Sequence, residues 1–332
     1  MSKQSDFLVK MNMDFEFKKA YAEIRVHEFI KECAKMNKDV YVSVGGIDSI
    51  TLYSFIKSLG YDIIGAGITS IEHPTVRKVH RELGIVEIKS HVSKYHVFIK
   101  YGVPIFSKDV AGKIKALQNP TTKNIGYRTE ILTGKTTMKS NREYSSIAKL
   151  SNKYINMYNS GCFEGIKISD RCCYYMKEYP MRLYAKSINA YPFLGLQASE
   201  SRRRFLSLSN NGCNYINGKN TRSAPFAIFN KSDILRLALE LNVHIPEAYG
   251  DIAIDDNGNY YTTSVARTGC DICGFGIQYE KIRPHRFDLL YNESPQKWNF
   301  WLVQMGYGEL FDRIGFQWRQ PYIPGEKSWI KI

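Results

Sequence analysis

Four cysteines in two close pairs are the residues of this chain whose type and spacing are best suited to chemistry. Cys172 and Cys173 are adjacent, and Cys270 and Cys273 form a Cys-x-x-Cys. Two thiolate pairs far apart in a sequence are the usual ligands of a four-sulfur metal site, for zinc or for an iron–sulfur cluster. Adjacent cysteines are unusual in a small zinc module and less unusual in a cluster. We therefore expect the four thiolates to converge on one metal centre.

The composition excludes several classes of protein. The 332 residues include seven cysteines, an odd number that fits a reducing compartment better than a disulfide framework. No run approaches the roughly 20 apolar residues that span a bilayer. Residues 1–15 are polar and mixed in charge, unlike a secretory signal. The prediction is a cytoplasmic protein with no membrane partner.

The charge predicts an anionic partner. The formal net charge is +14, which favours nucleic acid, nucleotides or an acidic surface. Basic residues are dense in the segment 110–155, where Glu130 and Glu143 are the only acids. This segment either contacts phosphates or is a solvated connector. Its basic residues are Lys113, Lys115, Lys123, Arg128, Lys135, Lys139, Arg142, Lys149 and Lys153.

A glycine turn follows the apolar run 40–44. Gly45 and Gly46 lead into Asp48 and Ser49, where a helix is expected to begin. Glycines let backbone N–H groups curl around an anion, and a helix N-terminus adds further N–H groups and partial positive charge. Ser49 can donate its hydroxyl, and Asp48 either holds Mg²⁺ or caps the helix. The same residues also fit a plain tight turn between a strand and a helix.

The elements that must position this turn alternate along the chain. Strand, helix, strand, helix, strand is typical of a parallel α/β sheet, which binds ligands at the carboxyl ends of its strands. Strands are predicted at 40–44, 62–68, 85–88 and 191–196, and helices at 14–36, 49–59, 75–83, 234–241 and 302–314. The predicted organisation is an N-terminal helix (1–37), one α/β domain that includes the metal site (38–285) and a C-terminal extension (286–332).

From about residue 38 to 315, the chain resembles the phosphoadenosine phosphosulfate (PAPS) reductase family of the N-type ATP pyrophosphatase superfamily. The glycine turn is similar to the pyrophosphate loop Ser-Gly-Gly-x-Asp-Ser. Four later stretches resemble the family's Cys-Cys, Gly-x-Arg-x-x-Glu-Ser-x-x-Arg, Arg-Pro…Asp-Ile and Cys-x-x-Cys-Gly motifs. They lie at 169–180, 195–204, 222–234 and 268–276.

The resemblance implies a fold, ligands and site residues. The fold is a twisted, mostly parallel sheet flanked by helices, like the adenine nucleotide alpha hydrolases, with a helical C-terminal extension. The ligands are ATP or a sulfated adenine nucleotide, Mg²⁺, and a 4Fe-4S cluster on Cys172, Cys173, Cys270 and Cys273, with zinc as the second candidate. The implied catalytic residues are Asp48, Ser49, Lys177 and Arg204. The implied nucleotide-binding residues are Ser43, Gly45, Gly46, Asp48, Ser49, Gly195, Glu200 and Arg222.

The chain also departs from the family pattern. Val44 replaces the first serine of the loop, Ile47 stands where many members have lysine, and Phe229 stands where tryptophan is common. Gln197 replaces an arginine. Reductases of this family use a cysteine of the C-terminal tail as the nucleophile, and no cysteine follows Cys273. Reduction by that route is therefore not expected.

Three functions follow, in order of preference. The first is an enzyme that cleaves ATP to an AMP adduct and pyrophosphate in sulfur transfer or nucleic-acid modification of the phosphorothioation kind. Its partners would be a nucleic acid and a sulfur-donor protein. The second is a sulfonucleotide reductase with an external reductant. The third is a catalytically degenerate protein that binds nucleotides or nucleic acid, and pyrophosphate release from ATP separates it from the first.

Overall fold

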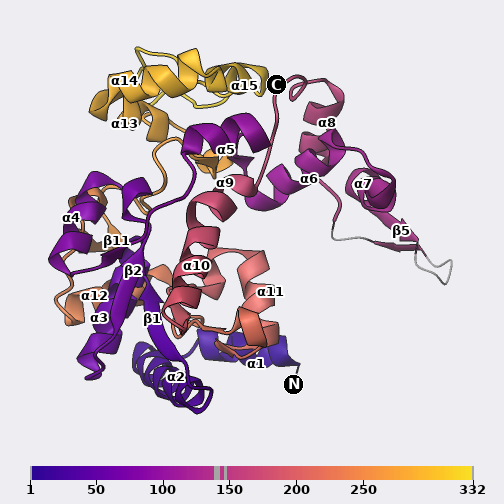
Figure 1. The fold of residues 1–332 in the computed structure, drawn as a ribbon. Coiled ribbons are helices and arrows are strands. Elements are labelled where there is room, and N and C mark those ends of the chain that lie inside the picture. The colour runs from indigo at the N-terminus through magenta and orange to yellow at the C-terminus, as the bar shows by residue number, and fades with distance from the viewer. Residues whose placement is uncertain (1, 138–142, 146–147, 331–332) are drawn as a thin grey trace. The chain divides into compact units, whose positions relative to one another are not determined.

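A computed structural model describes residues 2–137, 143–145 and 148–330, which Figure 1 shows as a ribbon. The chain forms two compact units, and each consists of two separate stretches. Unit 1 comprises Met1–Ser90 and Lys177–Cys270, and unit 2 comprises His91–Met176 and Asp271–Ile332. The expected boundaries at residues 37 and 285 stay a prediction. Lys139 and Arg142 of the basic segment lie outside the described residues.

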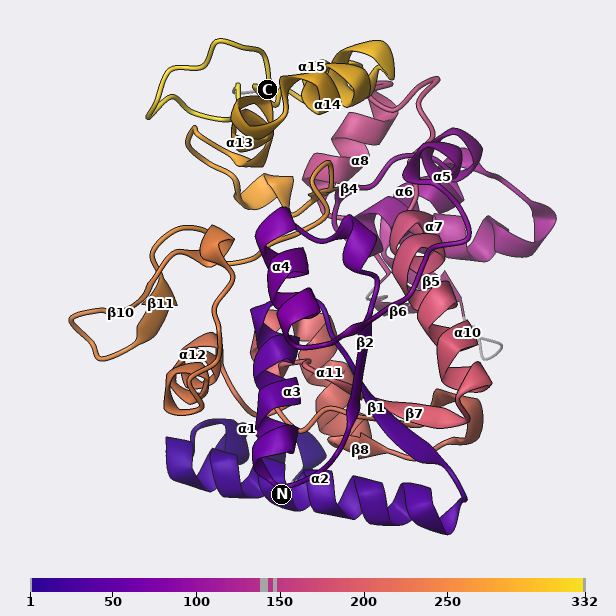
Figure 2. The ribbon, with the colours of Figure 1, turned by 60° about the vertical axis from the view of Figure 1, so that its left-hand side comes forward.

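Unit 1 is built on a six-stranded sheet with the strand order β3-β2-β1-β7-β9-β8. The strands are β1 (Asp39–Ser43), β2 (Ile64–Gly67), β3 (Val86–Glu87), β7 (Ala190–Leu194), β8 (Asn214–Tyr215) and β9 (Arg222–Ser223). Neighbours pair in parallel, except β8, which runs antiparallel to β9. Figure 2 shows β2, β1 and β7 side by side. The expected α/β class with a mostly parallel sheet is confirmed.

Helices cover both faces of this sheet because successive side chains of β1 point to opposite sides. Val42 belongs to a large apolar cluster with Phe29 of α2 (Phe15–Lys35) and Phe55 of α3 (Ile47–Ser58). Tyr41 packs on the other face, against residues of α10 (Tyr179–Ser187). The remaining helices of four or more residues described in unit 1 are α1 (Lys3–Met11), α4 (Pro74–Glu82), α11 (Arg202–Asn211) and α12 (Lys231–Glu240).

Local sequence signals explain where several of these helices begin. The Asp14 side chain accepts a hydrogen bond from the Phe17 N–H at 2.8 Å, which caps the start of α2. Asn230 and Asp233 form a reciprocal capping box at the start of α12. The helices predicted at 14–36, 49–59, 75–83 and 234–241 are therefore present, with ends that differ by a few residues.

Unit 2 is mainly helical and has an aromatic core. Its longer helices are α5 (Lys94–Tyr101), α6 (Lys108–Gln118), α7 (Ile125–Thr133), α8 (Asn152–Asn159), α13 (Arg286–Glu293) and α15 (Tyr307–Arg313). Its short strands form two pairs, β4 (Ile105–Phe106) with β12 (Gly274–Phe275) and β5 (Lys135–Thr137) with β6 (Glu143–Ser145). The rings of Phe287, Phe311 and Phe316 are buried and contact one another.

The helix predicted at 302–314 is wrong in one respect, because it is interrupted. A π-helix, η8 (Asn299–Gln304), ends before Gly306, and α15 begins after it. Gly306 has a φ of 71°, a left-handed conformation that glycine adopts without a steric penalty and that an α-helix cannot contain. The apolar periodicity continues across the break, so the pattern alone did not reveal it.

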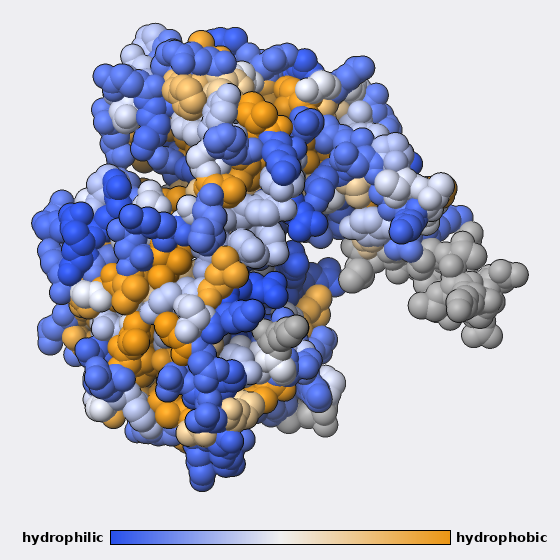
Figure 3. Space-filling view, viewed as in Figure 1, coloured by the Kyte–Doolittle hydropathy of each residue, from blue (hydrophilic) through white to orange (hydrophobic). Residues whose placement is uncertain are grey.

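None of the helices in the described parts of the chain is both long and apolar enough to cross a bilayer. The face shown in Figure 3 carries hydrophobic residues in patches between hydrophilic ones.

Candidate functional site

The candidate site lies where the strand order of unit 1 reverses. The chain adds β2 and β3 on one side of β1, and then β7 and β9 on the other. In open α/β sheets, ligands bind beyond the carboxyl ends of the two strands that flank such a reversal. Here those ends are Ser43 of β1 and Leu194 of β7, which are aligned in the parallel pair. The residues that follow them, Gly45 and Gly195, are thus brought to the same edge.

Gly195 is a glycine because the start of α3 lies against it. A Cβ at this position would be 3.0 Å from both the N and the Cα of Ser49, tighter than ordinary van der Waals contact. The loop after β7 and the N-terminus of α3 are therefore in direct contact. This explains how two stretches about 150 residues apart, predicted to belong to one site, meet in unit 1.

Ser49 and His80 hold the glycine turn in place. The Gly45 N–H donates to the Ser49 Oγ at 2.7 Å, and the Ser49 hydroxyl donates to the Gly46 carbonyl at 2.9 Å. The His80 Nε2 lies 2.7 Å from the Gly45 carbonyl oxygen. Burial lowers the pKa of His80, so its ring is neutral and Nε2–H donates to that carbonyl. The Ser49 hydroxyl thus orders the turn in this conformation.

The sequence suggested that Gly46 lets the backbone curl around an anion, but its backbone conformation does not require a glycine. Its φ is −78°, which any residue can adopt, so the turn is not a left-handed nest at this position. A Cβ on Gly46 would instead come closer than 3.0 Å to the Tyr249 hydroxyl oxygen. That hydroxyl accepts a hydrogen bond from the Ile47 N–H at 3.1 Å and lies 2.9 Å from the Thr268 Oγ1. The glycine therefore makes room for Tyr249.

Two cationic side chains near the turn, Lys231 and Lys177, are paired with carboxylates. The Lys231 Nζ is 2.6 Å from the Asp48 Oδ1, and the Lys177 Nζ is 2.7 Å from the Glu72 Oε1. The buried Glu72 lies beside the turn, since its Oε1 would be 3.6 Å from a Cβ on Gly45. In each pair the carboxylate offsets the charge of the ammonium group.

The loop after β7 carries a second set of charges. Glu200 forms ion pairs with Arg204 and with Arg267, the latter at 2.6 Å. Its Oε1 also accepts a hydrogen bond from the Gln197 N–H at 3.3 Å. The Gln197 side chain is 1% exposed, and its amide nitrogen is buried without a hydrogen-bond partner. A buried donor of this kind fits an acceptor atom of a ligand.

Arg222, another predicted nucleotide-binding residue, has its contacts elsewhere. Its Nη1 donates to the Asn220 carbonyl at 3.2 Å, and its guanidinium lies 4.9 Å from the centre of the Tyr215 ring. Both partners flank β9 or pair with it. No described contact joins Arg222 to the turn.

Sequence reasoning missed three residues of the site: Glu72, Lys231 and Tyr249. The only local signal was that Glu72 follows the end of β2 closely, which places it at the same edge of the sheet. Lys231 and Tyr249 have no local signal in the sequence that places them at the turn. Their partners are 105, 183 and 202 residues away in the sequence.

The four cysteines of the predicted metal centre are unbridged thiols and belong to both units. In unit 2, Tyr307 is fully buried, and its pKa is raised first by burial and then by the charges of Cys273 and Cys172. These two cysteines therefore lie near the same hydroxyl. In the parts of the chain that the structure describes, no three His, Cys, Asp or Glu side chains are grouped as a metal ion requires. The thiols fit the centre by type, and it stays a prediction.

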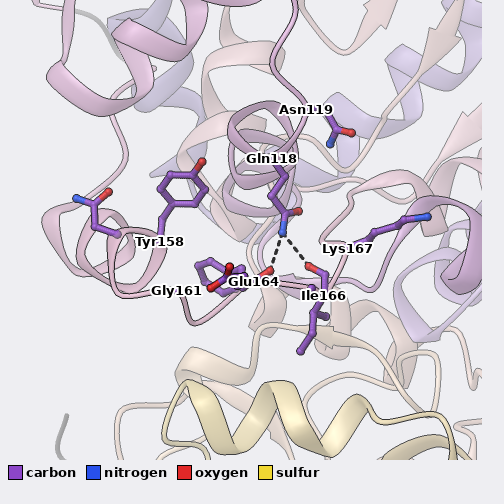
Figure 4. A pocket seen from close by; sticks show the side chains of 10 residues that line it. Gln118, Asn119, Tyr158, Gly161, Glu164, Ile166 and Lys167 are labelled. Atoms are coloured by element: carbon purple, nitrogen blue, oxygen red, sulfur yellow. Dashed lines mark hydrogen bonds between the residues drawn. The ribbon is translucent and has the colours of Figure 1, made fainter.

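A separate pocket of about 740 Å³ lies in unit 2 between the end of α6 and the residues after α8 (Figure 4). Gln118 holds one wall: its Nε2 donates to the carbonyls of Phe163 and Ile166, and its Oε1 accepts from the Ile168 N–H at 3.0 Å. The pocket contains none of the predicted site residues. The side-chain amide of Gln118 is engaged in the hydrogen bonds that shape the loop after α8.

The comparisons with known proteins add little to these observations. No family model matches the chain, and no curated protein is similar to it. Among solved structures, it is similar to PAPS reductase from Candida auris in a phosphate complex, with 11% identity and a TM-score of 0.36. The match covers 75% of this chain and 98% of that one.

Proposed function

We propose that this chain is an adenine-nucleotide enzyme of the PAPS reductase/ATP pyrophosphatase type. It cleaves ATP between the α- and β-phosphates, transfers AMP to an acceptor oxygen and releases pyrophosphate. The observation that carries this proposal is the position of the glycine turn. The turn begins α3 at the reversal point of the sheet, and the loop after β7 contacts the same helix end.

The residues around the turn suit a leaving group that gains negative charge. The first N–H groups of α3 have no acceptor within the helix, and its N-terminus carries partial positive charge. Lys177 and Lys231 add ammonium groups that a phosphate can share with Glu72 and Asp48. Donors fixed before the reaction stabilise the pyrophosphate charge as it develops.

Mg²⁺ fits this site by the type of its donors. Asp48 and Glu72 present the carboxylate oxygens that Mg²⁺ prefers, and each now lies beside a lysine ammonium group. Asp48 would hold the ion, which offsets the charge of the bound phosphates when present. Gln197 would give its unpartnered amide N–H to the nucleotide.

The acceptor is proposed from the distribution of charge. Residues 91–176 contain 14 Lys and Arg against five Asp and Glu, so most of the net +14 lies in this stretch of unit 2. Such an excess favours a polyanion. We assign a nucleic acid as the acceptor and a sulfur-donor protein as the partner. The donor's sulfur attacks the acceptor atom that bears the adenylylated oxygen. The bond from that atom to the oxygen breaks, AMP leaves with the oxygen, and sulfur takes the oxygen's place.

The four-cysteine centre completes the proposal without entering this reaction. Cys172, Cys173, Cys270 and Cys273 would hold a 4Fe-4S cluster, with zinc as the alternative. Paired thiols that are all unbridged support this assignment.

Pyrophosphate release from ATP in the presence of Mg²⁺ tests the reaction. The expected products are pyrophosphate and AMP or an AMP adduct, and Ser49→Ala should lower the rate because the turn loses two hydrogen bonds. Ser58→Ala is the matched control, since its hydroxyl donates to Phe55 of the same helix, far from the turn. Release of ADP and phosphate, or equal rates for both variants, would contradict the assignment.

A further inference from the structure

One hydroxyl of the protein already occupies the glycine turn. Tyr249, in the short helix η6 (Glu247–Tyr249), is 2% exposed and accepts a hydrogen bond from the Ile47 N–H at 3.1 Å. Its own hydrogen is then left to donate to the Thr268 Oγ1 at 2.9 Å. The Ile47 N–H is one of the first donors of α3, the kind of group that an anion takes at a helix N-terminus.

The contact with Tyr249 gives the Ile47 N–H a hydrogen-bond partner, which a buried donor needs. An unpaired backbone N–H in the protein interior costs free energy comparable to a lost hydrogen bond. The Tyr249 hydroxyl is this partner for the Ile47 N–H. Burial raises the pKa of Tyr249, so the group is a neutral hydroxyl. A phosphate oxygen carries charge and is the stronger acceptor.

Two further contacts involve Tyr249 or its neighbour in the sequence. The N–H of the preceding Ala248 donates to the Thr75 Oγ1 at 3.2 Å, which ties η6 to the start of α4. The Lys231 ammonium lies 5.8 Å from the centre of the Tyr249 ring and also pairs with Asp48. These contacts keep the segment of Tyr249 beside the turn.

We infer that Tyr249 sets the affinity of the turn for phosphate. Its hydroxyl accepts the hydrogen bond of the Ile47 N–H, the same donor that a phosphate oxygen of a nucleotide would take, so the two acceptors compete for it. The inference rests on the proposed function in taking a phosphate as the ligand, and it adds a residue that opposes binding. Thr268 assists Tyr249 because it accepts the hydroxyl's hydrogen.

Isothermal titration of the full chain with inorganic pyrophosphate, and separately with ATP, tests this inference. Tyr249→Phe keeps the ring and removes the competing oxygen, so the Kd for both ligands should fall by roughly two- to tenfold, the value of one hydrogen bond. Thr268→Val should act in the same direction with a smaller change. Tyr61→Phe is the control, since the Tyr61 hydroxyl is hydrogen-bonded to His27 of α2.

The outcomes separate this inference from the proposed function. If the unmodified protein binds ATP but Tyr249→Phe binds it equally or more weakly, Tyr249 is not a competitor and the inference fails while the function stands. If neither protein binds pyrophosphate or ATP, both ideas fail. An equal gain in Tyr61→Phe would also overturn the inference, because the effect would not come from the turn. Tighter binding by Tyr249→Phe alone supports it.

Discussion

The ammonium group of Lys231 lies 2.6 Å from the carboxylate of Asp48, although the two residues are 183 positions apart. Asp48 is in the first turn of α3, and Lys231 begins α12. Both side chains are partly exposed, so the pair is open to exchange with a ligand. Lys231 thus places an ammonium group at the phosphate-binding end of the helix, where a phosphate can share it with Asp48.

Lys231→Gln should therefore weaken ATP binding. The phosphates then lose the Lys231 ammonium group, and a loss of about 1 kcal/mol, typical of a partly exposed ion pair, corresponds to a roughly fivefold higher KM in the pyrophosphate assay. Lys35→Gln is the control, because it removes an exposed pair with Glu32 within α2. Equal KM values for both variants would show that Lys231 has no role in binding.

Gly46→Ala should destabilise the protein through one atom. The added Cβ meets the Tyr249 hydroxyl oxygen closer than 3.0 Å, whereas its next neighbours lie at 3.4 Å and 3.7 Å. Overpacking of this kind costs about 1–3 kcal/mol in the free energy of unfolding. In a Tyr249→Phe background, the same substitution should cost much less.

Urea denaturation of the two single variants and the double variant measures this coupling. Additive changes in the free energy of unfolding would mean that the hydroxyl does not limit residue 46. Gly126→Ala is the control, because it adds a Cβ in open space within a helix. Gly60→Ala is unsuitable, because Gly60 has a φ of 86°, which strains any other residue.

The free energy of unfolding should decrease at acid pH, partly because His80 becomes protonated. Burial lowers its pKa in the folded state below the ordinary value of 6.5, so the unfolded chain binds more protons as the pH falls below about 6.5. The stability contributed by neutral His80 is complete above pH 6.5 and is lost as the pH falls toward the folded-state pKa. Each such group contributes a slope of at most about 1.4 kcal/mol per pH unit.

His80→Gln should flatten the decline in the free energy of unfolding between pH 7 and pH 5. The exposed His96 offers the control, since His96→Gln removes no buried ring. His285, which is also buried with a lowered pKa, should contribute a second part of the same slope. An unchanged slope in His80→Gln would refute the assignment of a neutral ring.

Protein purified without oxygen should contain iron and absorb visible light, as a 4Fe-4S cluster requires. Cys270→Ser should lower the iron content because it removes one of four thiolate ligands. Cys162→Ser is the control, since the Cys162 thiol contacts Ser160 and the Arg313 carbonyl. Zinc in place of iron would favour the alternative metal, and protein with neither metal would rule out the centre.

Binding of a single-stranded oligonucleotide should weaken as salt is raised. Each phosphate neutralised by a lysine contributes about 0.7 to the slope of log K against log salt. Reversing three exposed charges of the basic segment should lower this slope and the affinity; the variant is Lys123→Glu/Lys135→Glu/Lys149→Glu. The control makes the same charge change in the C-terminal part of unit 2, as Lys281→Glu/Lys297→Glu/Lys327→Glu. Equal effects of both would leave net charge alone as the cause.

The sequence by itself determined the local elements and the class of fold. The apolar runs around β1 and β2 and the amphipathic α2 depend on residues a few positions apart, so their patterns predicted them. The glycine turn was visible for the same reason, because a strand, two glycines and a helix start are neighbours in the chain. Cysteine spacing gave the metal-site prediction, which no contact of the structure yet tests.

Only the tertiary structure decided what surrounds the turn. Three side chains lie beside it and pair with residues 105 to 202 positions away in the sequence: Tyr249, Lys231 and Glu72. Many other tyrosines, lysines and glutamates have the same local context. The sequence also suggested that Gly46 serves the backbone, whereas the close approach of Tyr249 requires it. Such contacts depend on how strands pair and helices pack across the whole unit, and no short-range pattern records that arrangement.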